Sequence, residues 1–439
     1  MKRVIEPGPL RGTVRAIPSK SDALRKLILS ALAGSPTLLA MDARSEDIDA
    51  AIRCLTALGA KIKPDQSSVL VEPIARGENT ADGRTWRSGE RVLDCAESAS
   101  LLRFLMPLIA ALGMEARFIT RGKLAGRPHD ALIAALRAHG VRVNTDAPTM
   151  SMSGQLTAGV FELPGDVSSQ FASGLLMALP LLESPSEIVF TSSIQSQGYI
   201  DLTLEVMRRF GLEARRTAQG YHVPAPQLVN SPSRLQVEGD WSNAAFFLAA
   251  NALGGDVRVS GLDTDSAQAD RDIVRLVQLY TGGNCATLDG QSHADTRDEN
   301  HTHQPWVSPQ NTIIIDVSDI PDLVPILAVI ATQAPRQTRI VGAARLRFKE
   351  SDRLSAMYEC LRGLGAQVRQ TPDALIIEGG NRLRGGEVSG YNDHRIVMAM
   401  AMAATVASAP VTIHGSDAVT KSYPGFYEDF AGLGGRVHG

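Results

Sequence analysis

The sequence predicts an α/β protein made of six copies of one unit, arranged as two related halves. The first observation is a repeat in which an amphipathic helix ends at a glycine and a short strand with alternating apolar residues follows. The repeat occurs around Gly59, Gly140, Gly211, Gly282, Gly365 and Gly434, most weakly at Gly282 and Gly434. The second observation is spacing, because copies one and four, two and five, and three and six are separated by 223, 225 and 223 residues. This regularity indicates two halves of three units each.

The glycine of each copy has a conformational reason. A helix commonly ends with one residue in the left-handed region, which a residue without a Cβ atom adopts at almost no cost. Between the helices lie β-rich segments bounded by turn residues, of which the clearest are 68–72, 187–190, 312–315 and 374–378. We therefore expect helices and strands to alternate along the whole chain.

The composition excludes several classes of protein. The 439 residues include 44 Lys and Arg against 47 Asp and Glu, and the net charge of −3 gives no excess that would favour nucleic acid or a membrane surface. The length and a hydrophobic fraction of 44% are typical of a globular protein with two or three domains. The longest apolar stretches, 104–113 and 174–182, are shorter than the ~20 residues that span a bilayer, and the first residues do not resemble a signal peptide. A cytoplasmic protein is expected.

The cysteines and histidines do not predict a metal centre. No cysteine lies in a CxxC pair or near a histidine at metal-ligand spacing; the four are Cys54, Cys95, Cys285 and Cys360. The polar segment 289–310 holds three histidines among acidic residues, but no fixed spacing frames them. We interpret this segment as a solvated loop insertion. We expect neither a metal nor a cofactor.

Polar motifs precede two apolar helical runs in the N-terminal half. Ser19-Lys-Ser21 places Lys20 and Ser21 at a helix start, where unpaired backbone amides favour an anion. Val167-Ser-Ser-Gln170 places hydroxyl and amide donors at another helix start, as sugar-like or phosphate ligands require. Either motif alone is equally typical of ordinary helix capping. Arg127 precedes Pro128, a residue that can open a helix.

The C-terminal half carries denser charged clusters, at 319–322, 345–353 and 392–395. The mixed charges of 345–353 are also compatible with a solvated face of ion pairs. Asn392 and Asp393 are natural helix caps. Such a cap would hold His394 and Arg395 in the first turn of the helix. Lysine is rare, with 8 lysines against 36 arginines, and three lysines lie in polar motifs: Lys20, Lys349 and Lys421.

Taken in order, these motifs resemble the 3-phosphoshikimate 1-carboxyvinyltransferase (EPSP synthase) family. They are Ser19-Lys-Ser21, Gly126-Arg-Pro128, Val167-Ser-Ser-Gln170, Ile320-Pro-Asp322, Lys349-Glu-Ser-Asp-Arg353 and Tyr391-Asn-Asp-His-Arg395, and they cover nearly the whole chain. The resemblance implies two similar domains, each of three βαβαββ units, with the active site in the interdomain cleft. It assigns residues 1–19 and 233–439 to the first domain and residues 20–232 to an inserted second domain, with a hinge near Pro18 and residues 231–233.

The resemblance also implies the reaction. The enolpyruvyl group of phosphoenolpyruvate would be transferred to the 5-hydroxyl of shikimate 3-phosphate with release of phosphate, in the shikimate pathway to chorismate and the aromatic amino acids. It assigns proton donation to the methylene carbon to Glu350 and proton acceptance from the hydroxyl to Asp322. Lys20 would contact both substrates and could protonate the departing group. The partners would be these small molecules alone, with no nucleic acid or membrane, and the protein would be a monomer.

Two sets of binding residues follow from the same resemblance, and both substrates are polyanions suited to guanidinium and ammonium groups. Shikimate 3-phosphate would be bound by Lys20, Ser21, Arg25, Ser168, Ser169, Gln170, Ser196, Tyr199, Asp322 and Lys349. Phosphoenolpyruvate would be bound by Lys20, Ala99, Arg127, Gln170, Arg353, Arg395 and Lys421. Ala99 stands where many family members have glycine, and its methyl group would crowd the longer inhibitor glyphosate more than the substrate. We therefore expect relative insensitivity to glyphosate.

Three alternatives remain at this point. The sister carboxyvinyltransferase that acts on UDP-N-acetylglucosamine expects Lys-Asn near its start and typically a cysteine in a mobile loop, whereas Lys20 is followed by serine and Cys95 lies in the apolar-flanked segment Leu93-Asp-Cys95. A repeat scaffold that binds proteins through stacked helices would not need charged motifs at helix starts. A non-catalytic, ligand-binding member of the fold would not need both proton-transfer carboxylates.

Overall fold

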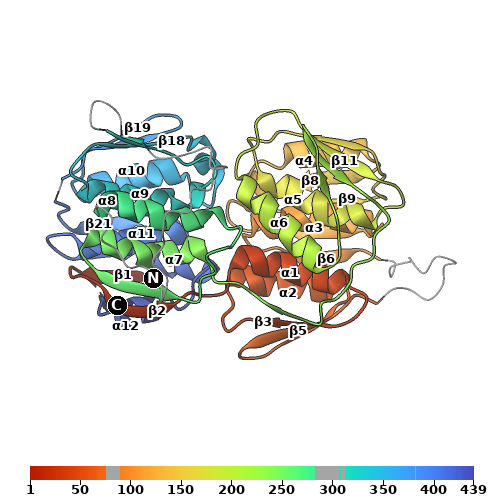
Figure 1. Ribbon diagram of the computed structural model, residues 1–439, viewed down its shortest axis with the longest axis horizontal. Coiled ribbons are helices and arrows are strands. Elements are labelled where there is room, and N and C mark those ends of the chain that lie inside the picture. Colours follow the sequence, from red (N-terminus) through yellow and green to blue (C-terminus); the bar gives the residue numbers. More distant parts are fainter. Residues whose placement is uncertain (76–88, 282–305, 308–311, 381) are drawn as a thin grey trace. The chain divides into compact units, whose positions relative to one another are not determined.

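The computed structural model describes residues 1–75, 89–281, 306–307, 312–380 and 382–439. The chain forms two compact units (Figure 1). The terminal unit comprises Met1–Ile17 and Gly239–Gly439, and the inserted unit comprises Pro18–Glu238. The copy of the repeat around Gly282 lies outside the described residues, and so does the segment 289–310 apart from the short strand β16 (Trp306–Val307).

Three four-stranded sheets of one pattern form the inserted unit. In each sheet the first strand is parallel to the second, and the third and fourth strands follow in antiparallel order. The strand orders are β14-β3-β5-β4, β6-β7-β9-β8 and β10-β11-β13-β12. The strands are β3 (Thr37–Ala40), β4 (Lys61–Pro64), β5 (Ser68–Glu72), β6 (Arg91–Asp94), β7 (Ala116–Ile119), β8 (Arg142–Asp146), β9 (Thr149–Ser153), β10 (Val160–Leu163), β11 (Ser186–Phe190), β12 (Arg215–Arg216), β13 (Gly220–Val223) and β14 (Arg234–Gln236).

Two sheets of the terminal unit repeat this pattern, in the orders β21-β22-β1-β23 and β17-β18-β20-β19, the latter extended by β16. A further parallel pair joins β15 to β2. Strand β1 lies between β22 and β23, so both ends of the chain share one sheet. The strands are β1 (Lys2–Glu6), β2 (Arg11–Arg15), β15 (Asp256–Ser260), β17 (Ile313–Asp316), β18 (Thr338–Val341), β19 (Val368–Gln370), β20 (Leu375–Ile377), β21 (Gly386–Ser389), β22 (Val411–His414) and β23 (Arg436–His438).

Each unit has three almost fully buried helices. In the inserted unit these are α1 (Lys20–Leu32), α3 (Ala99–Ala111) and α5 (Ser169–Ala178), and in the terminal unit α7 (Trp241–Ala249), α9 (Val324–Gln333) and α11 (His394–Thr405). Five of them are buried on nearly every side because most of their residues are apolar, whereas α1 also buries charged side chains, which are paired, as Lys26 is with Asp22. Figure 1 shows α3 and α5 side by side, and they are in extensive contact.

Among the described residues, the other six helices bury one side only, as their amphipathic sequences predict. They are α2 (Glu46–Ala57), α4 (Asp130–Ala138), α6 (Gln197–Arg209), α8 (Ile273–Thr281), α10 (Arg353–Gly363) and α12 (Phe426–Gly432). Short 3₁₀ helices complete the described elements: η1 (Leu124–Gly126), η2 (Leu179–Leu181), η3 (Ala250–Leu253), η4 (Ala269–Asp272), η5 (Pro321–Leu323), η6 (Ala344–Phe348) and η7 (Ser416–Lys421). Within the described ranges, no helix is both long enough and apolar enough to cross a membrane.

The repeat glycines have the conformation that the sequence predicts. Each described copy has its glycine two residues after the last helical residue, as Gly59 follows α2 and Gly365 follows α10. The five glycines have φ between 75° and 110°; they are Gly59, Gly140, Gly211, Gly365 and Gly434. The four predicted β segments correspond to β5, β11, β17 and β20. The order β6-α3-β7-α4-β8-β9 is one complete βαβαββ unit, so the predicted alternation is confirmed.

Candidate functional site

The buried helices begin with the polar motifs identified in the sequence. Ser19 caps α1 and accepts a hydrogen bond from the Asp22 amide, and Ser168 caps α5 by accepting from the Gln170 amide at 3.3 Å. Asp393 caps α11 by accepting from the Arg395 amide at 3.0 Å. The predicted helix starts are therefore confirmed. In each motif one polar side chain caps the helix. The neighbouring polar side chains lie in the first helical turn and do not act as the cap.

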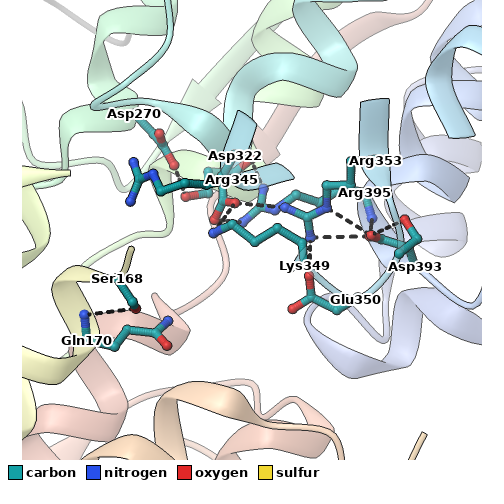
Figure 2. A network of polar contacts seen from close by, with 12 residues as sticks. Ser168, Gln170, Asp270, Asp322, Arg345, Lys349, Glu350, Arg353, Asp393 and Arg395 are labelled. Atoms are coloured by element: carbon teal, nitrogen blue, oxygen red, sulfur yellow. Dashed lines mark hydrogen bonds and ion pairs between the residues drawn. The ribbon is translucent and has the colours of Figure 1, made fainter. Parts of the chain in front are cut away.

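A cluster of charged side chains lies at the starts of three helices of the terminal unit. We call it the carboxylate–guanidinium cluster (Figure 2); it consists of Asp322, Lys349, Glu350, Arg353, Asp393 and Arg395. Asp322 lies in η5 immediately before α9, Arg353 is the first residue of α10, and Arg395 is the second residue of α11. The fold therefore brings together five predicted site residues that are scattered over more than seventy positions of sequence.

Arg353 is the centre of this cluster. Its Nε atom donates to Asp393 Oδ2 at 2.8 Å, its Nη1 to Asp322 Oδ1 at 2.8 Å, and its Nη2 to Glu350 Oε2 at 2.6 Å. Only 1% of the Arg353 side chain is exposed. Burial alone would lower the pKa of Arg353, but the carboxylates of Asp393, Glu350 and Asp322 raise it above its usual value. The guanidinium therefore stays charged and fixes three carboxylates at once.

Asp322 is surrounded by cations. It accepts from Arg353 and from Arg395 Nη2 at 3.0 Å, and Lys349 Nζ lies 3.6 Å from its Oδ1 atom. Burial would raise the pKa of Asp322, but the charges of Arg395, Lys349 and Arg353 outweigh burial and hold the pKa well below its usual value. Asp322 is thus ionised, as a proton acceptor must be. Burial also lowers the pKa of Lys349 to about 8.

Lys421 lies beside the turn that leads into α11. Its Nζ atom donates to the carbonyl of Asn392 at 2.7 Å, and the residue is buried. Tyr391 and Asn392 are both left-handed, with φ of 51° and 53°, a conformation that is costly for residues other than glycine and that clusters at functional sites. Lys421 is therefore held beside Asn392, the residue that precedes Asp393.

In the inserted unit, Arg25 connects two predicted residues through their backbone. Its Nη1 atom donates to the Ser21 carbonyl at 2.7 Å and its Nη2 to the Tyr199 carbonyl at 3.0 Å. Its Nε atom donates to Thr203 Oγ1 at 2.7 Å, and the guanidinium lies 4.9 Å from the centre of the Phe104 ring. Burial lowers the pKa of Arg25 to about 10, which leaves it charged at neutral pH.

Four more predicted residues of the inserted unit lie at helix starts: Lys20, Ala99, Ser169 and Ser196. Lys20, the first residue of α1, pairs with Asp47 Oδ2 at 3.0 Å, a partner that the sequence analysis missed. Ala99 and Ser169 are the first residues of α3 and α5, and both are buried. Ser196 precedes α6 in the left-handed conformation, and its carbonyl accepts from the Tyr199 amide at 3.2 Å.

Arg103 in α3 is a further residue of the site that the sequence analysis did not select. Its Nη1 atom donates to Gln170 Oε1 at 2.7 Å, and its Nη2 donates to the Pro128 carbonyl at 2.7 Å. The available signal was a single arginine within the apolar run 99–111. Pro128 does not open the helix as its position suggested, because His129 is the N-cap and α4 begins only at Asp130.

Arg127 lines a cavity of about 220 Å³ in the inserted unit. The other polar lining residues are Thr120, His129, Asp130, Thr145 and Thr149. The described cysteines, Cys54, Cys95 and Cys360, are free and buried. A search of the described ranges alone finds no group of three or more His, Cys, Asp or Glu residues that could hold a metal ion.

The chain matches the sequence model of the family described as EPSP synthase (3-phosphoshikimate 1-carboxyvinyltransferase) over residues 4–430. The chain belongs to the EPSP synthase family. A relative named 3-phosphoshikimate 1-carboxyvinyltransferase from Clostridium perfringens is 36% identical over 446 residues, covering 100% of this chain and 99% of the relative. One of the same name from Clostridium acetobutylicum is 37% identical over 438 residues, covering 99% of this chain and 97% of the relative.

Solved structures agree on the fold. The structure of an EPSP synthase from Acinetobacter baumannii matches with a TM-score of 0.75 and 24% identity, covering 100% of both chains. The resemblance drawn from the motifs and the predicted fold class are therefore confirmed. Membership of the EPSP synthase family also supports the carboxyvinyltransferase over the nucleotide-sugar, scaffold and non-catalytic alternatives. The individual site residues stay predictions.

Proposed function

We propose that this member of the EPSP synthase family transfers the enolpyruvyl group of phosphoenolpyruvate to the 5-hydroxyl of shikimate 3-phosphate, with release of phosphate. The observation that carries the proposal is the carboxylate–guanidinium cluster, in which Asp322 and Glu350 are both bound to Arg353. Two carboxylates beside several cations suit a reaction that moves protons between polyanionic substrates. The relatives' name, 3-phosphoshikimate 1-carboxyvinyltransferase, supports shikimate 3-phosphate as the acceptor, and the family resemblance supplies phosphoenolpyruvate as the donor.

Phosphoenolpyruvate is bound, in this proposal, by cations from both units. Arg353, Arg395 and Lys421 are held at helix starts or turns of the terminal unit. The inserted unit supplies Lys20, Arg127 and Gln170, with the methyl group of Ala99. Planar guanidinium groups match carboxylate and phosphate oxygens, and each charged hydrogen bond contributes about 1.5–3 kcal/mol.

Shikimate 3-phosphate takes hydroxyl, amide and cationic donors mainly from the inserted unit: Lys20, Ser21, Arg25, Ser168, Ser169, Gln170, Ser196 and Tyr199. Asp322 and Lys349 act on the same substrate from the terminal unit. Arg25 contacts the backbone of Ser21 and Tyr199, so part of its role is to fix these two residues. We also infer a cytoplasmic monomer that requires no macromolecular partner.

Proton transfer depends on how the cluster responds to anions. Asp322 is a weak base while three cations surround it. A bound phosphate or carboxylate group competes for Arg353 and Arg395, which weakens their hold on Asp322 and raises its pKa toward a value suited to accepting the hydroxyl proton. Glu350, protonated once its contact with Arg353 weakens, donates a proton to the methylene carbon while the hydroxyl oxygen bonds to the adjacent carbon, and it takes a proton back from the resulting methyl group as phosphate leaves, which restores the carbon–carbon double bond. Lys20 protonates the departing phosphate.

The test is phosphate release from phosphoenolpyruvate with shikimate 3-phosphate, with UDP-N-acetylglucosamine in a parallel reaction. Release only with shikimate 3-phosphate is expected. Glu350→Gln and Asp322→Asn should each lower kcat at least ~100-fold, since general acid–base catalysis contributes about 10²–10⁴-fold. The matched control is Glu428→Gln, an exposed carboxylate of α12 in the same unit, which should leave kcat unchanged. Near-normal turnover in either site variant would contradict its role.

A further inference from the structure

We infer that Arg103 is a positioning residue, which turns the amide nitrogen of Gln170 and the hydroxyl hydrogen of Ser168 toward the anionic substrates. The inference rests on the proposed function and adds to it how the donor character of these two residues is set. Arg103 itself is buried, with 4% exposure, whereas Ser168 and Gln170 are partly exposed. Arg103 therefore lies deeper in the protein than Ser168 and Gln170, the two residues that would contact the substrates.

The orientation of the Gln170 amide follows from Arg103 alone. A guanidinium group only donates hydrogen bonds, so the Gln170 atom that lies 2.7 Å from Arg103 Nη1 must be the carbonyl oxygen Oε1. The Nε2 atom, with its two hydrogens, is then turned away from Arg103. Without this contact the amide could rotate and present its oxygen to a phosphate group, which would repel it.

The hydroxyl of Ser168 is set by the same logic. Its Oγ atom accepts from Arg103 Nη1 at 3.3 Å and from the backbone N–H of Gln170 at 3.3 Å, the second contact being visible in Figure 2. A serine oxygen has two acceptor positions and one hydrogen to donate. Because both acceptor positions are used, the hydrogen points elsewhere. Ser168 and Gln170 thus present donors together, and the site favours ligands rich in acceptor oxygens.

Arg103 also holds the segment next to Arg127. Its Nη2 atom donates to the Pro128 carbonyl, and its Nε donates to His129 Nδ1 at 3.4 Å. The other ring nitrogen of His129 lies 3.0 Å from the Leu124 carbonyl and donates to it. Burial, and then the charge of Arg103, lower the pKa of His129 to about 4, so the ring is neutral and can accept from Arg103. Arg103 thus connects the start of α5 to the turn that carries Arg127.

A double-mutant cycle on kcat/KM for phosphoenolpyruvate tests this role. Arg103→Lys keeps a positive charge but cannot reach all four acceptors, and we expect it to lower kcat/KM about 10- to 100-fold, as misplacement of binding groups does. In a Gln170→Ala background the same change should cost clearly less than in the wild type, because the part of the loss that acts through Gln170 is already absent, while the part that acts through Ser168 and Pro128 remains. Equal losses in both backgrounds would overturn the inference.

The matched control is Arg25→Lys. Arg25 is a buried arginine of the same unit that packs on a phenylalanine ring, as Arg103 packs on Phe171, but its side chain donates to residues of α1, α5 and α6 other than Gln170. Arg25→Lys should lower kcat/KM by the same factor in the wild type and in Gln170→Ala. Thermal unfolding of every variant shows whether it folds.

A second variant, Gln170→Glu, tests the inference even if Arg103→Lys does not fold. Gln170→Glu leaves Arg103 in place and offers it a carboxylate, but removes the outward amide donor. We expect a KM for phosphoenolpyruvate at least ~10-fold higher than that of Gln170→Ala, since a carboxylate repels the substrate. A KM equal to or below that of Gln170→Ala would contradict the inferred orientation. Failure of the wild type to release phosphate would instead refute the proposed function.

Discussion

At the scale of single residues, we expect the methyl group of Ala99 to weaken the binding of glyphosate. Ala99 is the first residue of α3 and is 4% exposed, so its methyl group has little room to move. We expect Ala99→Gly to lower the inhibition constant for glyphosate at least ~10-fold, within the ~1–3 kcal/mol that one methyl-sized change produces in a pocket. The KM for phosphoenolpyruvate should change less, because the substrate is shorter.

The measurement is inhibition by glyphosate at several phosphoenolpyruvate concentrations, with the wild type and Ala99→Gly compared directly. Ala111→Gly, at the other end of the same helix, is the control for the loss of helix stability, which is about 1 kcal/mol. An unchanged inhibition constant in Ala99→Gly, or potent inhibition of the wild type, would contradict the expected insensitivity.

The lowered pKa of Lys349 predicts how kcat/KM depends on pH. Burial lowers the pKa of Lys349 to about 8, so the free protein loses this positive charge as the pH rises through 8. Because the ammonium form binds the anionic substrate, kcat/KM for shikimate 3-phosphate should fall above pH 8. Lys349→Arg keeps its charge at all these pH values, so its kcat/KM should not show this fall. The same fall in both proteins would assign it to another group.

At the scale of elements, Arg353 holds three helix starts of the terminal unit together. Asp393 is 0% exposed, and loss of Arg353 would leave its charge buried without its principal partner. We expect Arg353→Met to lower the free energy of unfolding by about 3–5 kcal/mol. In Arg353→Met/Asp393→Asn most of that loss should be recovered, because asparagine also caps helices. Turnover should not recover in the double variant.

Urea unfolding measures both variants, and an exposed ion pair of the same unit provides the control. Arg369 lies 3.7 Å from Glu378 and is 70% exposed, so Arg369→Met should change the free energy of unfolding by at most about 1 kcal/mol. If Arg353→Met unfolds no more easily than Arg369→Met, Arg353 does not stabilise the cluster as its contacts indicate.

The elements were predictable from the sequence because their signals are local. A glycine after an amphipathic run marks a helix end, and a polar residue before an apolar run marks a helix start; Gly365 and Ser168 show both rules in the structure. Asp322, Glu350, Arg353 and Arg395 were predictable as a set because each lies in a dense polar motif.

The contacts of Arg103 and Arg25 were not predictable because they are made across long separations. Arg103 reaches Gln170, 67 residues away, and Arg25 reaches Thr203, 178 residues away. A lone arginine in an apolar helix has no periodicity that would reveal such a partner. Only the packing of α3 against α5 brings Arg103 to Gln170.

At the scale of the whole molecule, each of the two units has its own sheets and its own buried apolar residues. The inserted unit is one continuous segment, Pro18–Glu238, and its first sheet is completed by β14, which pairs with β3 near the two ends of that segment. The terminal unit needs both ends of the chain, since β1 lies between β22 and β23. The inserted unit should therefore be the one that folds when expressed alone.

We expect residues 18–238 alone to unfold cooperatively and to be stabilised by shikimate 3-phosphate, because Ser21, Ser168 and Gln170 are all present. Thermal unfolding with and without millimolar shikimate 3-phosphate measures this, since a ligand that binds the folded state raises the midpoint. Ser168→Ala in the same segment is the control and should reduce the shift. No phosphate release is expected, because Asp322 and Glu350 belong to the terminal unit. Full turnover by the segment would refute their assigned roles, whereas a folded segment that ignores the ligand would show that binding itself needs Asp322 and Lys349.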